Sequence, residues 1–380
     1  MNNIEKNGYG KFPTVDCHLH ILRPEEMEII ARSVENAMEY FCFERVNLCA
    51  LVQMMTRYDP FNNARCFYVK SRLNTVENPN RCYVFANLWH HYDERDTAEG
   101  YLQQVKDLMA MGADGIKLLD GKPEYRKKLA RPLDDPIFDP MFAYLEKEGI
   151  PILYHVGDPG DKWDAEAGTR KYGEFLDDTH PTLPQLWDEA EGILKKFPKL
   201  RLCWAHFLFL GFKPEKAKAL LDRYENMMFD TTPGGEMFVG FTTYPQEWRQ
   251  IFIDYADRIL YGSDTYNTWL DNNEDPETHQ IGGIRINQCR RMLEWNEPFE
   301  DPFFGKLQPM HLPQAALEKI YYKNFLRFAG DPRPLNHERI AQMVREVRAE
   351  VKGGTKDIYP EKDRDLYLAN ANQMIYYFQK

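Results

Sequence analysis

The sequence predicts an α/β fold, a (β/α)8 TIM barrel with additional C-terminal helices. Eight short, almost continuously apolar runs alternate with longer amphipathic segments, as expected for parallel strands covered on both faces. The runs start roughly every 25 to 50 residues, a spacing that suits a barrel with insertions. An open doubly wound sheet is the competing architecture. However, no G-x-G-x-x-G turn follows the first run, and eight units favour the closed barrel.

The predicted elements follow one another along the chain. Strands are predicted over 14–21, 45–53, 81–89, 113–119, 151–157, 201–208, 226–232 and 258–265. Helices are predicted over 23–41, 97–112, 139–149, 214–225, 245–257, 311–330, 336–354 and 366–378. Pro24 suits the first turn of the first helix, and Gly112 and Gly149 suit helix ends.

The whole chain, 1–380, is expected to form one domain, with the barrel core at about 12–330 and C-terminal helices at about 331–380. The last helices are expected to pack on the barrel or on a second subunit. No linker rich in Gly, Ser or Pro divides the chain.

Composition excludes several classes of function. A net charge of −11 argues against nucleic-acid binding, which needs clustered Lys and Arg. The seven cysteines are scattered and form no C-x-x-C pair, which predicts buried thiols in a reducing compartment. The first residues lack the apolar core of a signal peptide, and no apolar run is long enough to cross a membrane. We therefore expect a cytoplasmic protein that binds neither nucleic acid nor membrane.

The motif V-D-C-H-L-H in the first predicted strand is the first indication of chemistry. Alternate side chains of a strand share a face, so Asp16, His18 and His20 are expected on one face and the apolar residues 15, 17 and 19 on the other. Two imidazoles so placed can hold one metal ion. Alone, the motif fits ordinary buried or surface histidines equally well.

Other predicted strands also end in residues that bind metals or move protons. The fourth carries Lys117, the fifth ends at His155, the sixth at His206 and the eighth at Asp264. Reactive residues of TIM barrels lie at these C-terminal ends. Each residue has an ordinary alternative, such as a hydrogen-bonded buried histidine or an aspartate in a turn. The recurrence of ligand-type side chains at the ends of the first, fifth, sixth and eighth strands predicts a metal site.

The donor set indicates which metal and which chemistry. Two or three imidazoles and one carboxylate suit one divalent ion, Zn²⁺ first, with Mn²⁺, Fe²⁺ or Co²⁺ as alternatives. An open coordination position admits water, whose pKa the metal lowers from about 15.7 to about 7.

These motifs resemble the metal-dependent amidohydrolase superfamily, specifically the branch that includes aminocarboxymuconate-semialdehyde decarboxylase. The matching stretches are VDCHLH, GADGIKLL, PILYHVGD, RLCWAH, ILYGSD and IYYKNFLRFAG. The chain departs from the branch at three places: it has KLLD for KLHP, GSDTYN for GSDYP, and HFLFLGF where a glycine-rich turn is usual.

The resemblance implies roles for individual residues. His18, His20, His155 and Asp264 correspond to metal ligands, and His206 to the histidine that positions water or substrate. Lys117 matches a lysine that is carbamylated and bridges two metals in binuclear members, whereas this branch is usually mononuclear. The resemblance also implies a homo-oligomer, a dimer or larger.

Two long loops follow the fifth and eighth predicted strands, over 158–185 and 266–283. Such loops at the active end of a barrel often form pocket walls. Besides Lys117, we expect substrate contacts from Trp89, His91 and Arg170, and consider Trp163, Lys171 and Trp269. The alternative is that these residues only pack the loops.

Three functions are compatible with these residues. The first is a hydrolase, in which metal-bound hydroxide attacks an amide, cyclic amide or lactone carbonyl of a small molecule. Asp264 would then carry the proton to the leaving group, and His206 would stabilise the oxyanion. The second is a decarboxylase of a small unsaturated or aromatic acid, with Lys117, Arg170 or Lys171 holding the carboxylate. The third is a non-catalytic binding barrel.

Overall fold

The computed structural model describes residues 10–22, 26–54, 57–163, 175, 177–233, 237–266, 281–353 and 364–380. Its main sheet contains β1 (Val15–His20), β2 (Arg45–Cys49), β5 (Cys82–Asn87), β6 (Gly115–Gly121), β7 (Ile152–Val156), β8 (Leu202–Trp204), β9 (Met227–Asp230), β10 (Ile259–Leu260) and β11 (Thr265–Tyr266). Each predicted run overlaps one of these strands, and the eighth run overlaps the last two.

The sheet closes into a barrel through its eighth run. Neighbouring strands are parallel, in the order β10-β9-β8-β7-β6-β5-β2-β1-β11. β10 pairs with β9, while β11, four residues later, pairs with β1. The backbone N–H of Cys17 also donates to the carbonyl of Tyr261 (3.0 Å), between the two short strands. The prediction of a TIM barrel is therefore confirmed.

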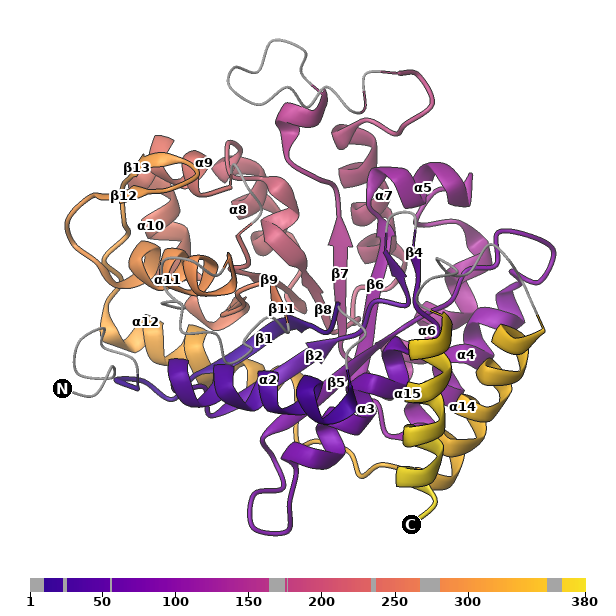
Figure 1. The fold of residues 1–380 in the computed structure, drawn as a ribbon. Helices are drawn as coiled ribbons and strands as arrows, with labels where there is room; N and C mark the ends of the chain where they lie inside the picture. Colours follow the sequence, from indigo (N-terminus) through magenta and orange to yellow (C-terminus); the bar gives the residue numbers. More distant parts are fainter. Residues whose placement is uncertain are drawn as a thin grey trace.

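Helices surround the barrel and follow its strands (Figure 1). They are α2 (Met27–Phe41), α3 (Asn62–Leu73), α4 (Ala98–Met111), α5 (Pro123–Leu129), α6 (Asp139–Glu148), α7 (Leu183–Lys196), α8 (Pro214–Arg223), α9 (Met237–Thr243), α10 (Pro245–Asp254), α11 (Ile281–Glu294), α12 (Gln314–Glu318) and α13 (Asn324–Ala329). Short hairpins, β3 (Gln53–Met54) with β4 (Arg57–Tyr58) and β12 (Phe299–Asp301) with β13 (Gly305–Leu307), complete this part. Gly112 and Gly149 end α4 and α6 in the left-handed conformation, as predicted, whereas Pro24 lies outside the described residues.

The C-terminal helices α14 (His337–Lys352) and α15 (Arg364–Phe378) lie side by side against α3 and α4 (Figure 1). The arm that leads to them is fixed at the end of α4. Asn336 N donates to Met111 O (3.0 Å), and Arg333 N donates to Asp114 Oδ1 (2.6 Å). Gly112 is required here, because its φ is +105° and a Cβ would meet Pro334 O at 2.5 Å.

The barrel interior is small and sealed at the bottom. Its core comprises Val15, Cys17, Cys49, Tyr83, Phe85, Leu153, Cys203, Ala205, Met228 and Leu260. Phe325 and Phe328 of α13 join this core, with ring centroids 5.1 Å from Tyr83 and 6.1 Å from Phe85, respectively. None of the described helices is long and apolar enough to cross a membrane.

A one-residue bulge in β1 overturns the predicted facing of its side chains. Asp16 pairs with Val46, but Leu19 pairs with Leu48, so β1 has one extra residue. Cys17 therefore lies in the barrel interior, while Leu19 joins the outer core. Asp16 does not share a face with the two histidines: its carboxylate accepts hydrogen bonds from Ser263 Oγ (2.5 Å) and from His18 N (3.1 Å).

Candidate metal centre

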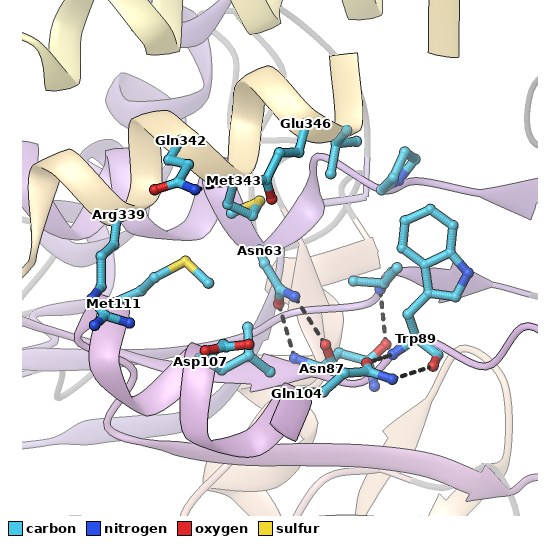
Figure 2. Close-up of a pocket in the computed structure, with 14 residues that line it drawn as sticks. Asn63, Asn87, Trp89, Gln104, Asp107, Met111, Arg339, Gln342, Met343 and Glu346 are labelled. Carbon is cyan, nitrogen blue, oxygen red and sulfur yellow. Dashed lines mark hydrogen bonds between the residues drawn. The ribbon is translucent and has the colours of Figure 1, made fainter. Parts of the chain in front are cut away.

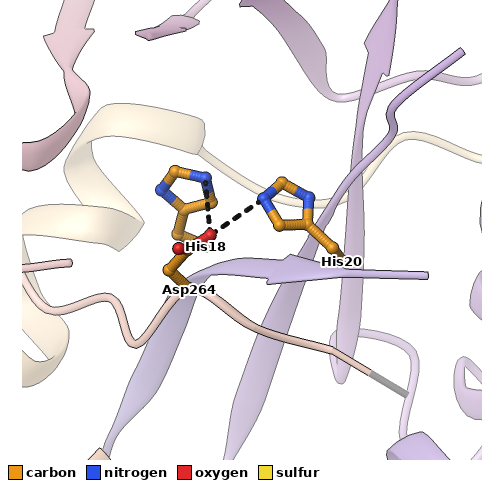
Figure 3. A group of neighbouring side chains, drawn as sticks. All are labelled: His18, His20 and Asp264. Atoms are coloured by element: carbon orange, nitrogen blue, oxygen red, sulfur yellow. Dashed lines mark ion pairs between the residues drawn. The ribbon is translucent and has the colours of Figure 1, made fainter. Parts of the chain in front are cut away.

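Three predicted residues meet at the C-terminal ends of the strands. His18 and His20 come from β1, and Asp264 lies between β10 and β11. Their ligand atoms all lie within 4.8 Å of one another. Asp264 Oδ1 lies 3.2 Å from His20 Nε2 and 3.9 Å from His18 Nε2, so both contacts converge on one oxygen (Figure 3).

The hydrogen bonds at the far side of each ring show that this group suits a cation. His18 Nδ1 donates to Asp230 Oδ2 (2.8 Å), and His20 Nδ1 donates to the carbonyl of Cys49 (2.7 Å). A neutral ring protonated at Nδ1 has a lone pair on Nε2. The His20 lone pair then faces the Asp264 carboxylate, and the His18 lone pair lies 3.9 Å from the same oxygen and 3.0 Å from Lys117 Nζ. Such a contact is favourable only with a proton or a metal ion between the atoms, and this donor set fits a divalent metal.

His155 and His206 form a second pair beside this group. His155 Nε2 lies 3.0 Å from the carbonyl of Gly157, and His155 Nδ1 lies 3.1 Å from His206 Nε2. The His206 ring centroid lies 5.6 Å from that of His18. Burial lowers the pKa of both His155 and His206 to about 3, helped by Lys122 for His155 and by His155 for His206. Both rings are therefore neutral at pH 7, and His155 stands next to the compact group of three without joining it.

Lys117 is buried inside the barrel, directly against the first histidine. Its Nζ lies 3.0 Å from His18 Nε2, on the side opposite Asp230. Burial lowers the pKa of Lys117. A lysine amine at this point can donate to His18 or to a molecule bound beside it.

Asp264 has an unusual backbone and a cationic partner. Its φ is +53°, in the left-handed region. Burial alone would raise the pKa of its carboxyl, but the guanidinium of Arg285 and the contact with His20 hold that pKa well below its usual range. Arg285, on α11, donates from Nη1 to Asp264 Oδ2 (2.7 Å) and to the Asp264 carbonyl (2.5 Å).

His206 stands at the start of a left-handed turn of ordinary residues. The predicted strand over 201–208 is wrong beyond Trp204, because β8 gives way to η3 (Ala205–Phe209). Four successive residues have positive φ: His206 (54°), Phe207 (49°), Leu208 (52°) and Phe209 (55°). Each costs about 1–2 kcal/mol relative to the right-handed form. The glycine-rich turn usual in the family that the sequence resembles is absent, so packing must compensate.

Aromatic packing holds this turn in place. The Phe207 ring stacks on Phe229 (4.7 Å between centroids) and on Phe252 (5.2 Å), and it meets Trp248 edge-on (5.6 Å). Trp187 Nε1 also donates to the carbonyl of Leu208 (2.7 Å).

Sequence analysis missed Asp230 and Arg285. Asp230 ends β9, so the reasoning from strand ends that selected His155 could also have selected it. Arg285 lies on a helix beyond the eighth strand, where no local signal marks it.

Burial also raises the pKa of Asp16 to about 7, against hydrogen bonds from Ser263 and His18 that lower it.

Trp89 and His91, the substrate contacts expected on the third strand, lie just after its end. β5 ends at Asn87, so Trp89 and His91 belong to the following loop, with their rings stacked at 5.3 Å. Trp89 lines a cavity of about 400 Å³ between α4 and α14 (Figure 2). None of its lining residues belongs to the metal centre. Arg170, Lys171 and Trp269 lie outside the described residues, and Trp163 Nε1 donates to Pro181 O (3.0 Å) within its own loop.

Two lysines and one aspartate stand beside His155. Asp158 accepts hydrogen bonds from Lys122 Nζ (3.0 Å) and Lys162 Nζ (2.9 Å), and its Oδ1 lies 3.8 Å from His155 Nε2. This cluster has an excess of positive charge next to the centre.

Comparison with known proteins agrees with this architecture. Residues 15–328 match the family described as Amidohydrolase. The chain resembles an uncharacterized TIM-barrel protein from Bordetella bronchiseptica, with a TM-score of 0.52 and 12% identity over 83% of this chain and 98% of that one. It also resembles the apo form of IDCase from Metarhizium anisopliae, with a TM-score of 0.52 and 15% identity over 83% of this chain and 97% of that one. None of the curated proteins compared with the chain matches it.

Proposed function

The chain belongs to the amidohydrolase family, and from this premise we propose that it is a metal-dependent hydrolase of an amide, cyclic amide or lactone bond in a small molecule. Family membership implies an enzyme that is a hydrolase or a decarboxylase. The observation that carries the proposal is the convergence of His18, His20 and Asp264 within 4.8 Å, with His20 Nε2 at 3.2 Å and His18 Nε2 at 3.9 Å from one carboxylate oxygen.

We assign His18, His20 and Asp264 as ligands of one divalent ion, Zn²⁺ first, with His155 as the fourth. When bound, the ion supplies a Lewis acid that lowers the pKa of water from about 15.7 to about 7. Asp264 takes the proton of the attacking water and passes it to the leaving group. Arg285 supports the ligand role of Asp264, because it keeps the carboxylate ionised and oriented.

The hydrogen bonds of His206 change the role expected for it. Its Nδ1 lies 2.9 Å from Thr232 Oγ1 and 3.3 Å from Thr232 O, so Nδ1 carries the proton and Nε2 is an acceptor. An acceptor orients a water molecule but cannot donate to an oxyanion. We therefore propose that His206 holds the attacking water. The buried Lys117 Nζ, next to His18, is then the nearer donor for the substrate oxygen.

The remaining expectations belong to the same proposal. We propose that the chain acts as one domain and forms a homo-oligomer in the cytoplasm. Trp89, His91 and Arg170 remain proposed substrate contacts, and carbamylation of Lys117 remains the alternative for a second metal.

Metal analysis and turnover together test the hydrolase. We expect close to one divalent ion per chain in purified protein, loss of activity on chelation and recovery with Zn²⁺. A panel of lactones, cyclic amides and esters should include a substrate whose turnover disappears in Asp264→Asn. Protein that binds no divalent metal would refute the proposal. Bound metal without turnover of any panel member or of carboxylic acids would identify a non-catalytic binding barrel.

A decarboxylase of a small unsaturated or aromatic acid is the second candidate. The observation that favours it is the pair of lysines, Lys122 and Lys162, which share Asp158 next to His155 and could hold a carboxylate. Release of CO₂ from acids in the panel, without hydrolysis of neutral lactones or amides, would favour this activity over the first.

A further inference from the structure

Asp230 connects two histidines of the centre through one buried carboxylate. It is the last residue of β9 and has no exposed surface. Its Oδ2 accepts from His18 Nδ1 (2.8 Å), and its Oδ1 accepts from the backbone N–H of His206 (2.8 Å). One oxygen therefore holds a residue of β1, and the other holds a residue of the turn after β8.

Only hydrogen-bond donors surround Oδ1, so this position requires an acceptor atom such as oxygen. Besides His206 N, Thr232 N lies 3.2 Å and Thr232 Oγ1 lies 2.5 Å from Oδ1. Two of these donors are backbone N–H groups, which cannot reverse their direction. The side chain at position 230 must therefore present an acceptor on this side, and its other polar atom faces His18.

This arrangement dictates where the proton of each histidine lies. A carboxylate oxygen only accepts, so the neutral His18 ring carries its proton on Nδ1 and its lone pair on Nε2, toward Asp264. The Thr232 hydroxyl has a single hydrogen, which it gives to Asp230. It must then accept the Nδ1 proton of His206, which leaves the lone pair on His206 Nε2, 3.1 Å from His155 Nδ1.

We propose that Asp230 is a positioning residue that fixes the tautomers of His18 directly and of His206 through Thr232. It thereby presents one lone pair to the metal and the other to the attacking water. The inference rests on the proposed function, because it assigns the metal to His18 Nε2. Carboxylate partners of this kind orient metal-binding histidines and raise their basicity.

Two substitutions at position 230 separate this role from a purely structural one. In Asp230→Asn the backbone donors hold the amide oxygen at the Oδ1 position, so the NH₂ group faces His18 Nδ1 and drives the ring proton to Nε2. In Asp230→Ala the ring is free to adopt either tautomer. We expect Zn²⁺ affinity, measured by chelator competition, to fall roughly 100-fold in Asp230→Asn and less in Asp230→Ala. A structural role alone predicts the reverse order, because alanine removes every hydrogen bond of the carboxylate, and that order would overturn the inference.

A spectroscopic measurement on metal-free protein gives a second test. Long-range ¹H–¹⁵N correlations of ¹⁵N-histidine-labelled protein should report a proton on Nδ1 of His18 in the wild type and on Nε2 in Asp230→Asn. An unchanged His18 tautomer in the folded Asn variant would overturn the inference, even if Asp230→Ala fails to fold. This result does not depend on bound metal, so it is distinct from a failure of the hydrolase proposal.

Thr232→Val is the matched control for the indirect branch. Valine keeps the shape but removes the hydroxyl that receives the His206 proton. We expect Zn²⁺ affinity to stay within about threefold of the wild type, since His206 is not a proposed ligand. The His206 Nδ1 signal should shift, because the carbonyl of residue 232, at 3.3 Å, is then its remaining acceptor. An unchanged His206 signal would remove His206 from the inference.

Discussion

The left-handed turn at His206 allows its backbone strain to be measured. Leu208 has φ 52° and ψ 25° and is buried, and two residues later Leu210 is buried with φ −85° and ψ 15°. We propose four variants: Leu208→Ala, Leu208→Gly, Leu210→Ala and Leu210→Gly. Within each pair the cavity left by the leucine is nearly the same, so comparing glycine with alanine isolates the backbone term.

The expected values follow from two opposing contributions. At an ordinary position a glycine variant has a free energy of unfolding about 0.5–1 kcal/mol lower than the alanine variant, because its unfolded chain is more flexible. At a left-handed position glycine also avoids about 1–2 kcal/mol of steric cost. We therefore expect Leu208→Gly to be more stable than Leu208→Ala by about 0.5–1 kcal/mol. The order should reverse at Leu210 by a similar amount.

Urea unfolding followed by tryptophan fluorescence measures both differences. The stability of glycine relative to alanine at position 208, minus the same quantity at position 210, removes the contribution of glycine flexibility. What remains is the backbone strain of Leu208, about 1–2 kcal/mol. If glycine is the less stable member of both pairs by the same amount, Leu208 is not strained. The explanation of how the turn is held would then be wrong.

Three further predictions concern the centre and the core. Zn²⁺ should raise the thermal unfolding midpoint, since only native protein binds the ion, and removing the metal or introducing Asp264→Asn should reduce this increase. The same increase in wild type and variant would contradict the ligand assignment. Metal-free protein should lose stability as pH falls from 6.5 toward 4, because unfolded chains protonate His155 and His206 while the native rings have pKa values of about 3. Each ring contributes roughly 1.4 kcal/mol per pH unit, and the His18 ring, whose pKa burial also lowers, adds to this loss. Asp16, with a native pKa of about 7, offsets one ring, and Asp230 and Asp114, whose pKa values burial raises, oppose the loss as pH falls further. Urea midpoints that rise at the first acidification below pH 6.5 would contradict this balance. Phe325→Ala should cost about 3–5 kcal/mol of unfolding free energy with kcat unchanged, because it opens the bottom of the barrel away from the centre; equal losses of stability and kcat would place the effect at the site.

The order of elements could be predicted because each strand is covered on both faces and so shows as a continuous apolar run. The rule that reactive residues lie at the C-terminal ends of barrel strands placed His18, His20 and Asp264 at one end, and the structure brings them together. Closure of the barrel was predicted from the number of strand–helix units, while the pairing of β11 with β1 could be seen only in the structure.

What the sequence could not predict depends on register and on distant partners. The bulge in β1 adds one residue relative to β2, and no local pattern reveals it, so Asp16 was placed on the wrong face. The left-handed turn contains no glycine to mark it, because its conformation depends on the aromatic cluster around Phe207. The role of His206 could be assigned only once Thr232 and Asp230 were seen beside it.

The helix that covers the bottom of the barrel, α13, is synthesised after all the strands that it covers. Phe325 and Phe328 are made after every strand of the sheet, yet they cover Tyr83 and Phe85 of a strand made much earlier. During translation the apolar lower end of the barrel stays uncovered until α13 leaves the ribosome. A nascent chain that stalls between the eighth strand and α13 therefore displays this apolar surface, and it is the intermediate that a chaperone would have to protect.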